Sequence, residues 1–407
     1  MRKTIIVNQA PHGIGPILRA AEMTQDLWHM LAKEGKNCEM VFTEPDKPFI
    51  KKILEKETFA NDRALEHIWL APEYGEIVNA FGFGSPDYKD RLENIALNRS
   101  NLETRLNGLL GKGMEAYNLV NPKKTMKVEY SDILCEVSHN PIVRTTKHDT
   151  SHDDNYPMFY TTIGLFSEML ENAADVMPRY KDAELRKIIR SCINEAEKVE
   201  MSQEILMIAE PSAMTYKERN MEKWECTIPP FIRPPSGSTE EIGEGVYLNI
   251  SGIKSVQEQM VALAKPFLEA GYAVYYPPSY KEGIEGGIEK APVENGISIF
   301  SNPGIITAVG RLGWSSVWEP NMNGSPFITY EYSDKEDPEM HHNVRTLEKF
   351  GLGLVMKAGD DPLEVMETAL ALRPRIKEYY DRLRNKYGTL DGVNYAANLV
   401  YKRLKDI

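Results

Sequence analysis

The sequence predicts an α/β protein made of two doubly wound, Rossmann-like domains that face each other across a cleft. Apolar, β-branched runs alternate with segments of helical spacing in both halves of the chain, and a proline-rich segment at residues 227–245 interrupts the alternation. Such alternation is typical of mainly parallel sheets covered by helices. Because ligands of these sheets bind at the carboxyl ends of the strands, we expect the binding site in the cleft.

The first half of the chain opens with a strand, a loop and a helix. Thr4–Val7 is β-branched and apolar, Pro and Gly punctuate the loop, and helical spacing runs from Ile17 to a stop at Gly35. The pattern then predicts a strand at 37–44, mostly helix at 51–124, two strands at 127–137 and helices at 157–223. We expect residues 1–226 to form an N-terminal domain and 227–245 a linker.

The alternation restarts after the linker. Apolar runs predict strands at 245–253, 272–279, 296–300 and 304–310, with a helix at 255–271 and another from about Ser315. We therefore expect a second domain at 246–372. The remaining residues, 373–407, have helical spacing and are expected to pack back over the outside.

The size and charge of the chain restrict its function. Its 407 residues suffice for two or three domains. A net charge of −12 argues against a nucleic-acid partner and against sequence-independent binding to an anionic membrane. The four cysteines form no CxxC pair, so we expect neither a zinc site nor a disulfide framework, and a cytoplasmic location. No window approaches the ~20 apolar residues of a transmembrane helix.

The segment "RLGWSSVWE", residues 311–319, joins a predicted strand to a predicted helix. The first turn of a helix has unpaired N–H groups and a partial positive charge, which bind anions. Arg311 adds a positive, forked donor, and Glu319 is placed to accept hydrogen bonds from ribose hydroxyls. These groups together predict a nucleoside diphosphate site. The alternative is an ordinary helix with Ser315 as its N-cap, Trp314 in the core and Glu319 on the surface.

This segment and the sequence after it resemble the nucleotide-sugar-binding region of GT-B-fold glycosyltransferases, especially the inverting enzymes that use UDP- or TDP-sugars. The resemblance implies sugar transfer from such a co-substrate to the hydroxyl of a small molecule, lipid or glycan bound by the N-terminal domain. It implies no tightly bound cofactor and no metal. The implied donor-binding residues are Ser251, Gly252, Arg311, Gly313, Trp314, Ser315, Ser316, Glu319, Glu339 and Asn343.

The chain departs from the family pattern at three places. The first loop of many members reads Gly-His-x-x-Pro, whereas this chain reads "HGIGP", which places Gly13 where the catalytic histidine stands and His12 one residue earlier. Arg311 replaces a phosphate-binding histidine and keeps a donor and a positive charge. The sugar-contacting Asp-Gln pair reads Glu339-Met340, and a methionine cannot hydrogen-bond a sugar, so the sugar cannot be identified.

His12 is the first candidate for the catalytic base. An imidazole with a pKa near 6.5 can accept a proton at neutral pH, and its loop, with Gly13 and Gly15, is expected on the acceptor side. The alternative is a loop histidine that bonds a backbone carbonyl.

A second polar loop lies at "KHDTSHDD". Related transferases carry an aspartate that faces the acceptor in a loop here, which makes His148 and Asp149 the second candidates for proton transfer. His148 and His152 have the i, i+4 spacing of metal ligands, but no third histidine is near in sequence, so we expect no metal site.

Two functions remain open from the sequence. The first is an inverting glycosyltransferase, and the second is a nucleotide-sugar epimerase, a hydrolase or a non-catalytic nucleotide-binding protein on the same fold. The absence of Gly-His favours the second, whereas the diphosphate and ribose residues are consistent with both. Whether the chain forms a homodimer is left open.

Overall fold

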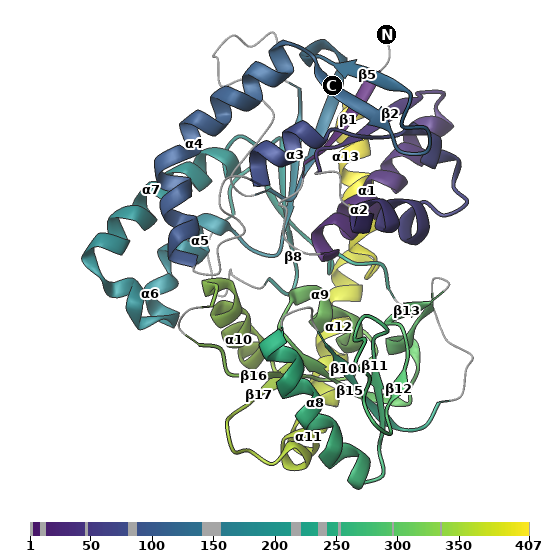
Figure 1. Ribbon diagram of the computed structural model, residues 1–407, viewed down its shortest axis with the longest axis vertical. Coiled ribbons are helices and arrows are strands. Elements are labelled where there is room, and N and C mark those ends of the chain that lie inside the picture. The colour runs from purple at the N-terminus through teal and green to yellow at the C-terminus, as the bar shows by residue number, and fades with distance from the viewer. Residues whose placement is uncertain are drawn as a thin grey trace. The chain divides into compact units, whose positions relative to one another are not determined.

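The computed structural model describes residues 3–8, 14–44, 48–79, 88–140, 156–212, 221–234, 242–250, 254–294, 297–333 and 336–406. The chain divides into two units, drawn in Figure 1. The first unit comprises residues 1–210, 217–231 and 392–407, and the second comprises 211–216 and 232–391. The chain passes from one unit to the other at 231–232, within the segment 227–245. The acceptor and donor roles of the units stay predictions.

The first unit contains a nine-stranded sheet in the order β5-β4-β3-β2-β1-β6-β7-β8-β9. All neighbouring strands from β3 to β9 are parallel, and β4 and β5 extend the sheet in antiparallel pairs. The order runs outward in both directions from β1 and β6, as in doubly wound sheets. The strands are β1 Lys3–Asn8, β2 Cys38–Phe42, β3 Ile68–Leu70, β4 Met114–Asn118, β5 Thr125–Val128, β6 Ile133–Ser138, β7 Met158–Thr162, β8 Ile205–Ala209 and β9 Glu225–Ile228.

Helices cover this sheet because their apolar faces need burial. The α-helices of the first unit are α1 Ile14–Lys33, α2 Pro48–Lys52, α3 Pro72–Asn79, α4 Tyr88–Gly111, α5 Phe166–Glu171, α6 Ala173–Val176, α7 Ala183–Glu200 and α13 Gly392–Asp406. A π-helical turn at Ile53–Thr58 and 3₁₀ turns at Arg63–His67, Tyr130–Asp132 and Pro178–Lys181 connect them. No helix in the described ranges, in either unit, is long and apolar enough to cross a membrane.

The last helix of the chain, α13, packs against α1, the first (Figure 1). Asn394 Nδ2 donates to Asp26 Oδ2 at 3.1 Å, and the Tyr401 hydroxyl donates to Glu34 at 2.5 Å. Lys405 also forms an ion pair with Glu34. The chain therefore returns to the first unit after completing the second.

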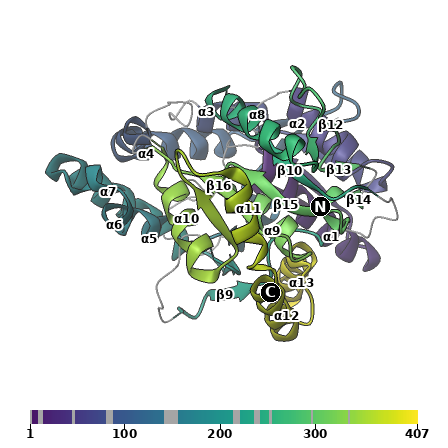
Figure 2. The ribbon, with the colours of Figure 1, turned by 90° about the horizontal axis from the view of Figure 1, so that it is seen from below.

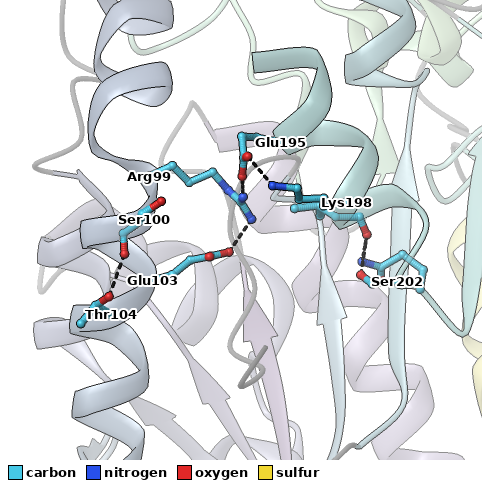
Figure 3. Close-up of polar contacts among 9 residues, drawn as sticks. Arg99, Ser100, Glu103, Thr104, Glu195, Lys198 and Ser202 are labelled. Carbon is cyan, nitrogen blue, oxygen red and sulfur yellow. Dashed lines mark hydrogen bonds and ion pairs between the residues drawn. The ribbon is translucent and has the colours of Figure 1, made fainter. Parts of the chain in front are cut away.

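A buried arginine joins α4 to α7 (Figure 3). Arg99 is only 4% exposed, and its guanidinium forms ion pairs with Glu103 on its own helix and with Glu195 on α7. Lys198 approaches Glu195 to 2.6 Å from the following turn. Because a buried cation needs compensating charge, this cluster fixes how the two helices pack.

The second unit contains a six-stranded, fully parallel sheet in the order β12-β11-β10-β15-β16-β17. The order reverses between β10 and β15, which makes the carboxyl ends of these two strands the topological switch point. The strands are β10 Gly245–Asn249, β11 Ala273–Tyr276, β12 Ile288–Glu289, β15 Ile305–Gly310, β16 Phe327–Tyr330 and β17 Gly353–Met356; β13 Val293–Glu294 and β14 Ile297–Ser298 form a separate hairpin.

Figure 2 looks onto the second unit, with α8, α10 and α11 around the strands. Buried aliphatic side chains such as Val246, Ile306 and Ile328 form its core with apolar residues of α8 and α11. The α-helices are α8 Lys254–Glu269, α9 Trp314–Asn321, α10 Pro338–Phe350, α11 Pro362–Leu370 and α12 Arg373–Tyr387, with a 3₁₀ turn at Ile299–Ser301.

The predicted fold class, two α/β domains with doubly wound sheets, is confirmed, but two stretches contain more strands than expected. The segment 51–124, predicted as mostly helix, includes β3 and β4, and the segment 157–223 includes β7 and β8. These strands have three to five residues, too few for a period-2 pattern to stand out beside helical neighbours. The helices of 373–407 divide between the units, with α12 in the second and α13 in the first.

Arg99→Ala should destabilise the first unit strongly. The substitution removes the cation that bridges Glu103 and Glu195 and leaves only Lys198 beside Glu195. Breaking a buried ion pair in this way costs about 3–5 kcal/mol. Urea unfolding followed by circular dichroism measures the loss. The matched control is Lys187→Ala, which removes an exposed ion pair with Glu184 on α7 and should leave the midpoint unchanged. Equal midpoints for Arg99→Ala and the wild type would contradict the assigned role.

Candidate functional site

The turn between β15 and α9, in the second unit, is the centre of the predicted site. β15 is buried along its whole length and ends at Gly310, where a Cβ atom would lie 2.8 Å from the carbonyl oxygen of Asn249 on β10. Only glycine fits this approach. Gly313 is the N-cap of α9, with φ −77° and ψ 134°, and no side chain caps the helix. The first-turn N–H groups of α9 are thus left without a side-chain acceptor.

The two serines of the turn are half-buried in the first turn of α9. Ser316 Oγ accepts a hydrogen bond of 2.9 Å from Nδ2 of Asn249, the last residue of β10, so its own proton is free to point elsewhere. Ser315 is the second residue of the helix. The alternative interpretation, in which Ser315 is the N-cap, is therefore wrong, because Gly313 has that position.

Trp314 is turned into the second unit rather than toward solvent. Its side chain is 2% exposed, and its indole Nε1 donates to the carbonyl oxygen of Pro211 at 2.6 Å. The indole N–H therefore already has a hydrogen-bond acceptor and is not available to a ligand. A ligand at this turn could meet Trp314 through the backbone N–H in the first turn of α9.

Arg311 follows β15 directly and is 29% exposed. One guanidinium nitrogen lies 3.8 Å from Oε2 of Glu336, which is 38% exposed. An ion pair this open to water contributes little to stability. The guanidinium is therefore available to an anionic ligand with better geometry, such as a phosphate that takes two parallel hydrogen bonds.

Helix α10 brings two more of the predicted residues to Arg311. Glu339 Oε1 accepts a hydrogen bond from Asn343 Nδ2 at 3.4 Å. Burial raises the pKa of the Glu339 carboxyl above its ordinary value, although the positive charge of Arg311 and the bond from Asn343 act in the opposite direction. Asn343 is fully buried, and its Oδ1 has no hydrogen-bond partner among the described residues. The structure thus gathers Arg311, Glu339 and Asn343 into one polar group.

Glu319 is the sixth residue of α9 and is half-buried. Burial raises the pKa of the Tyr247 hydroxyl on β10, and the nearby charge of Glu319 raises it further. Tyr247 remains protonated and donates to the carbonyl oxygen of Lys290 at 3.2 Å. The carboxylate is therefore held close to the strand that, with β15, forms the switch point.

The other predicted site residues fall mostly outside the described residues. These are His12, Gly13, His148, Asp149, Ser251 and Gly252. Gly15 is the second residue of α1 in the first unit. Nothing in the described ranges gathers three or more His, Cys, Asp or Glu side chains in a way that could hold a metal ion.

Four residues that lie near the carboxyl ends of the central strands of the two sheets were not predicted from the sequence. Asn249, Tyr332 and Glu336 contact the turn in the second unit, and only Asn249, a polar residue at a strand end, carries a recognisable signal. The fourth, His139, follows β6 in the first unit. Burial lowers its pKa to about 4, and its Nδ1 lies 2.9 Å from the hydroxyl of Thr161, so the ring is neutral and bonded to β7.

The fold of the whole chain matches that of solved glycosyltransferases. UDP-glucose:anthocyanidin 3-O-glucosyltransferase in complex with UDP superposes with a TM-score of 0.63 at 13% identity, covering 100% of both chains. UGT2 from Phytolacca americana, complexed with UDP-2-fluoro-glucose and pterostilbene, gives the same values. CalG4, the calicheamicin glycosyltransferase, gives 0.62 at 13% identity, covering 100% of this chain and 99% of CalG4. The chain thus has the GT-B fold.

Sequence comparisons add no closer relationship. No protein-family model matches the chain, and no curated protein matches its sequence. The likeness to the solved glycosyltransferases is therefore one of fold.

Glu339→Gln should stabilise the second unit at neutral pH but not in acid. A carboxyl whose pKa is raised on folding binds its proton more tightly in the folded state, so its ionisation lowers the free energy of unfolding as the pH rises above 4.5. The substitution removes that loss. Urea midpoints at pH 4 and pH 7.5 measure the difference, with Glu348→Gln, an exposed position on the same helix, as control. A gain that is as large at pH 4 as at pH 7.5 would contradict the assignment.

Proposed function

We propose that the protein is a glycosyltransferase that moves a sugar from a nucleotide sugar to the hydroxyl of an acceptor. The observation that carries the proposal is the turn at the switch point of the second unit. There, a partly exposed arginine directly precedes an uncapped helix start, and a half-buried glutamate follows on the same helix, all within residues 311–319. The same fold holds UDP or a UDP-sugar in several of the solved glycosyltransferases.

We infer that the donor is a UDP-sugar. A TDP-sugar is the alternative donor and should be tested beside it. Arg311 pairs with the diphosphate, and the first turn of α9 with Ser315 and Ser316 donates to its oxygens. Glu319 accepts hydrogen bonds from the ribose hydroxyls. Thermal shifts with UDP, TDP, GDP and CMP rank the nucleotides, because binding to the folded state raises its stability.

The proposed reaction is a single displacement with inversion. A base removes the proton of the acceptor hydroxyl, the acceptor oxygen bonds to the anomeric carbon, and the bond to the nucleoside diphosphate breaks with its electron pair leaving on the phosphate. Arg311 and the helix start stabilise the charge that develops there. We assign the base to His12, with His148 and Asp149 as second choice. The acceptor is a small hydroxylated molecule. Pterostilbene and quercetin are bound in two of the solved glycosyltransferases.

Incubation with UDP-glucose and TDP-glucose, with and without a mixture of hydroxylated acceptors, tests the function directly. A transferase gives a glycosylated acceptor and free nucleoside diphosphate in equal amounts. Acceptor-independent release of the diphosphate with free or altered sugar would instead identify a hydrolase or epimerase. Binding without any product would identify a non-catalytic nucleotide-binding protein.

Arg311→Ala should weaken UDP binding by roughly 10- to 150-fold, because it removes a charge-assisted pair worth about 1.5–3 kcal/mol. Uridine, which lacks the phosphates, should bind almost as before, and Arg311→Lys should recover only part of the loss. Glu319→Gln should weaken UDP and uridine alike. Calorimetric titration measures the nucleotide affinities of these three variants, and Glu336→Gln is the matched control. That variant removes the other half of the ion pair and should bind UDP at least as tightly as the wild type. Unchanged UDP affinity in Arg311→Ala would refute the diphosphate site.

His12→Ala should lower turnover by roughly 10²- to 10⁴-fold, the contribution expected of a general base. UDP affinity should stay unchanged, because the base acts on the acceptor. Steady-state kinetics with the best donor and acceptor provide the test. Turnover equal to that of the wild type would move the role away from His12, and Asp149→Asn, measured in parallel, shows whether the second loop carries it.

A further inference from the structure

The backbone of Leu312 is held on both sides by side chains from distant parts of the second unit. Its N–H donates to the hydroxyl oxygen of Tyr332 at 2.6 Å, and its carbonyl oxygen accepts a hydrogen bond of 3.0 Å from Nδ2 of Asn343. Tyr332 follows β16, whereas Asn343 lies on α10. The Leu312 side chain is completely buried. One residue of the turn is therefore fixed by three separate contacts.

The Tyr332 hydroxyl has a second partner. It shares a hydrogen bond with the hydroxyl of Thr329, which is 2.8 Å away and fully buried on β16. Burial raises the pKa of Tyr332, so the proton stays in place at neutral pH. The ring lies 4.9 Å from that of Tyr330 and contacts His341, whose Nε2 donates to the carbonyl oxygen of Ser333 at 3.1 Å.

Leu312 stands between the two groups that the proposed function assigns to the diphosphate. Arg311 precedes it, and Gly313, the N-cap of α9, follows it. The N–H of Gly313 donates to the carbonyl oxygen of Arg311 at 2.8 Å, which closes a tight turn around Leu312. A change in the backbone conformation at Leu312 would therefore displace the guanidinium and the helix start together. Anion binding is sensitive to displacements well below 1 Å.

We propose that Tyr332 is a positioning residue for the diphosphate. It acts by fixing the N–H of Leu312, while Asn343 fixes the carbonyl of the same residue. Tyr332 itself does not touch the ligand. It holds Arg311 and the first turn of α9 in the binding geometry before the nucleotide arrives, so that ordering the turn costs nothing on binding. This inference rests on the proposed function, because the ligand it concerns is the nucleoside diphosphate.

The test is Tyr332→Phe, which removes the hydroxyl and keeps the ring. Calorimetric titration should show UDP affinity lowered by roughly 5- to 30-fold, as expected for one lost hydrogen bond and an unpaired N–H, and uridine affinity lowered less than about twofold. Tyr272→Phe is the matched control. It makes the same change in a half-buried tyrosine that packs against the core of the second unit, and it should leave the ratio of UDP to uridine affinity unchanged.

A double-mutant cycle separates positioning from a general loss of stability. If Tyr332 acts through Arg311, adding Tyr332→Phe to Arg311→Ala should lower UDP affinity much less than it does in the wild type. Hydrogen exchange gives a second reading, since the Leu312 amide should exchange slowly in the wild type and faster in Tyr332→Phe.

Two results would overturn the inference in distinguishable ways. If the wild-type protein binds no nucleoside diphosphate, the proposed function fails and the positioning role fails with it. If the wild type binds UDP but Tyr332→Phe retains the wild-type ratio of UDP to uridine affinity, the proposed function stands and Tyr332 has only a structural role.

Discussion

The close approach of β10 and β15 at Gly310 is the constraint on which the candidate site depends. Because no Cβ atom separates the strands there, the carbonyl of Asn249 lies against Gly310 and the side chain of Asn249 reaches Ser316. The chain then leaves the sheet directly above the switch point and starts α9 within three residues, at Gly313. The anion-binding groups of the turn lie together because the sheet brings the two strands together first.

The charges around this turn explain why its backbone matters. Arg311 lies 3.8 Å from Glu336, and its charge also acts on the Glu339 carboxyl. One positive charge thus faces two carboxylates, and a diphosphate would add further negative charge. The unpaired N–H groups of a helix start must supply the rest of the attraction. In the proposed arrangement their placement depends on the backbone of Leu312, so we expect Tyr332 to affect affinity without touching the ligand.

The pattern of the sequence pointed to residues 311–319, and the family resemblance pointed to Glu339 and Asn343, but neither pointed to Tyr332 or Glu336. Arg311 to Glu319 stand out because an apolar strand, a glycine turn and a helix follow each other without interruption. Tyr332 and Glu336 reach the same turn from beyond β16, and that proximity depends on the order of strands in the sheet, which no local pattern reveals. The short strands β3 and β7 were missed for a related reason, since pairing with longer neighbours overrides their local pattern.

The docking of α13 onto α1 makes the first unit discontinuous, with the second unit inserted within it. During synthesis, residues 232–391 emerge and can fold while the first unit still lacks its final helix. Until α13 has been synthesised, the face of α1 that contacts it stays uncovered. Proteolytic release of a free N-terminal fragment, cut anywhere between the units, would expose the same apolar face. The first unit is therefore completed only after residues 392–406 have been synthesised, and it joins segments from both sides of the second unit.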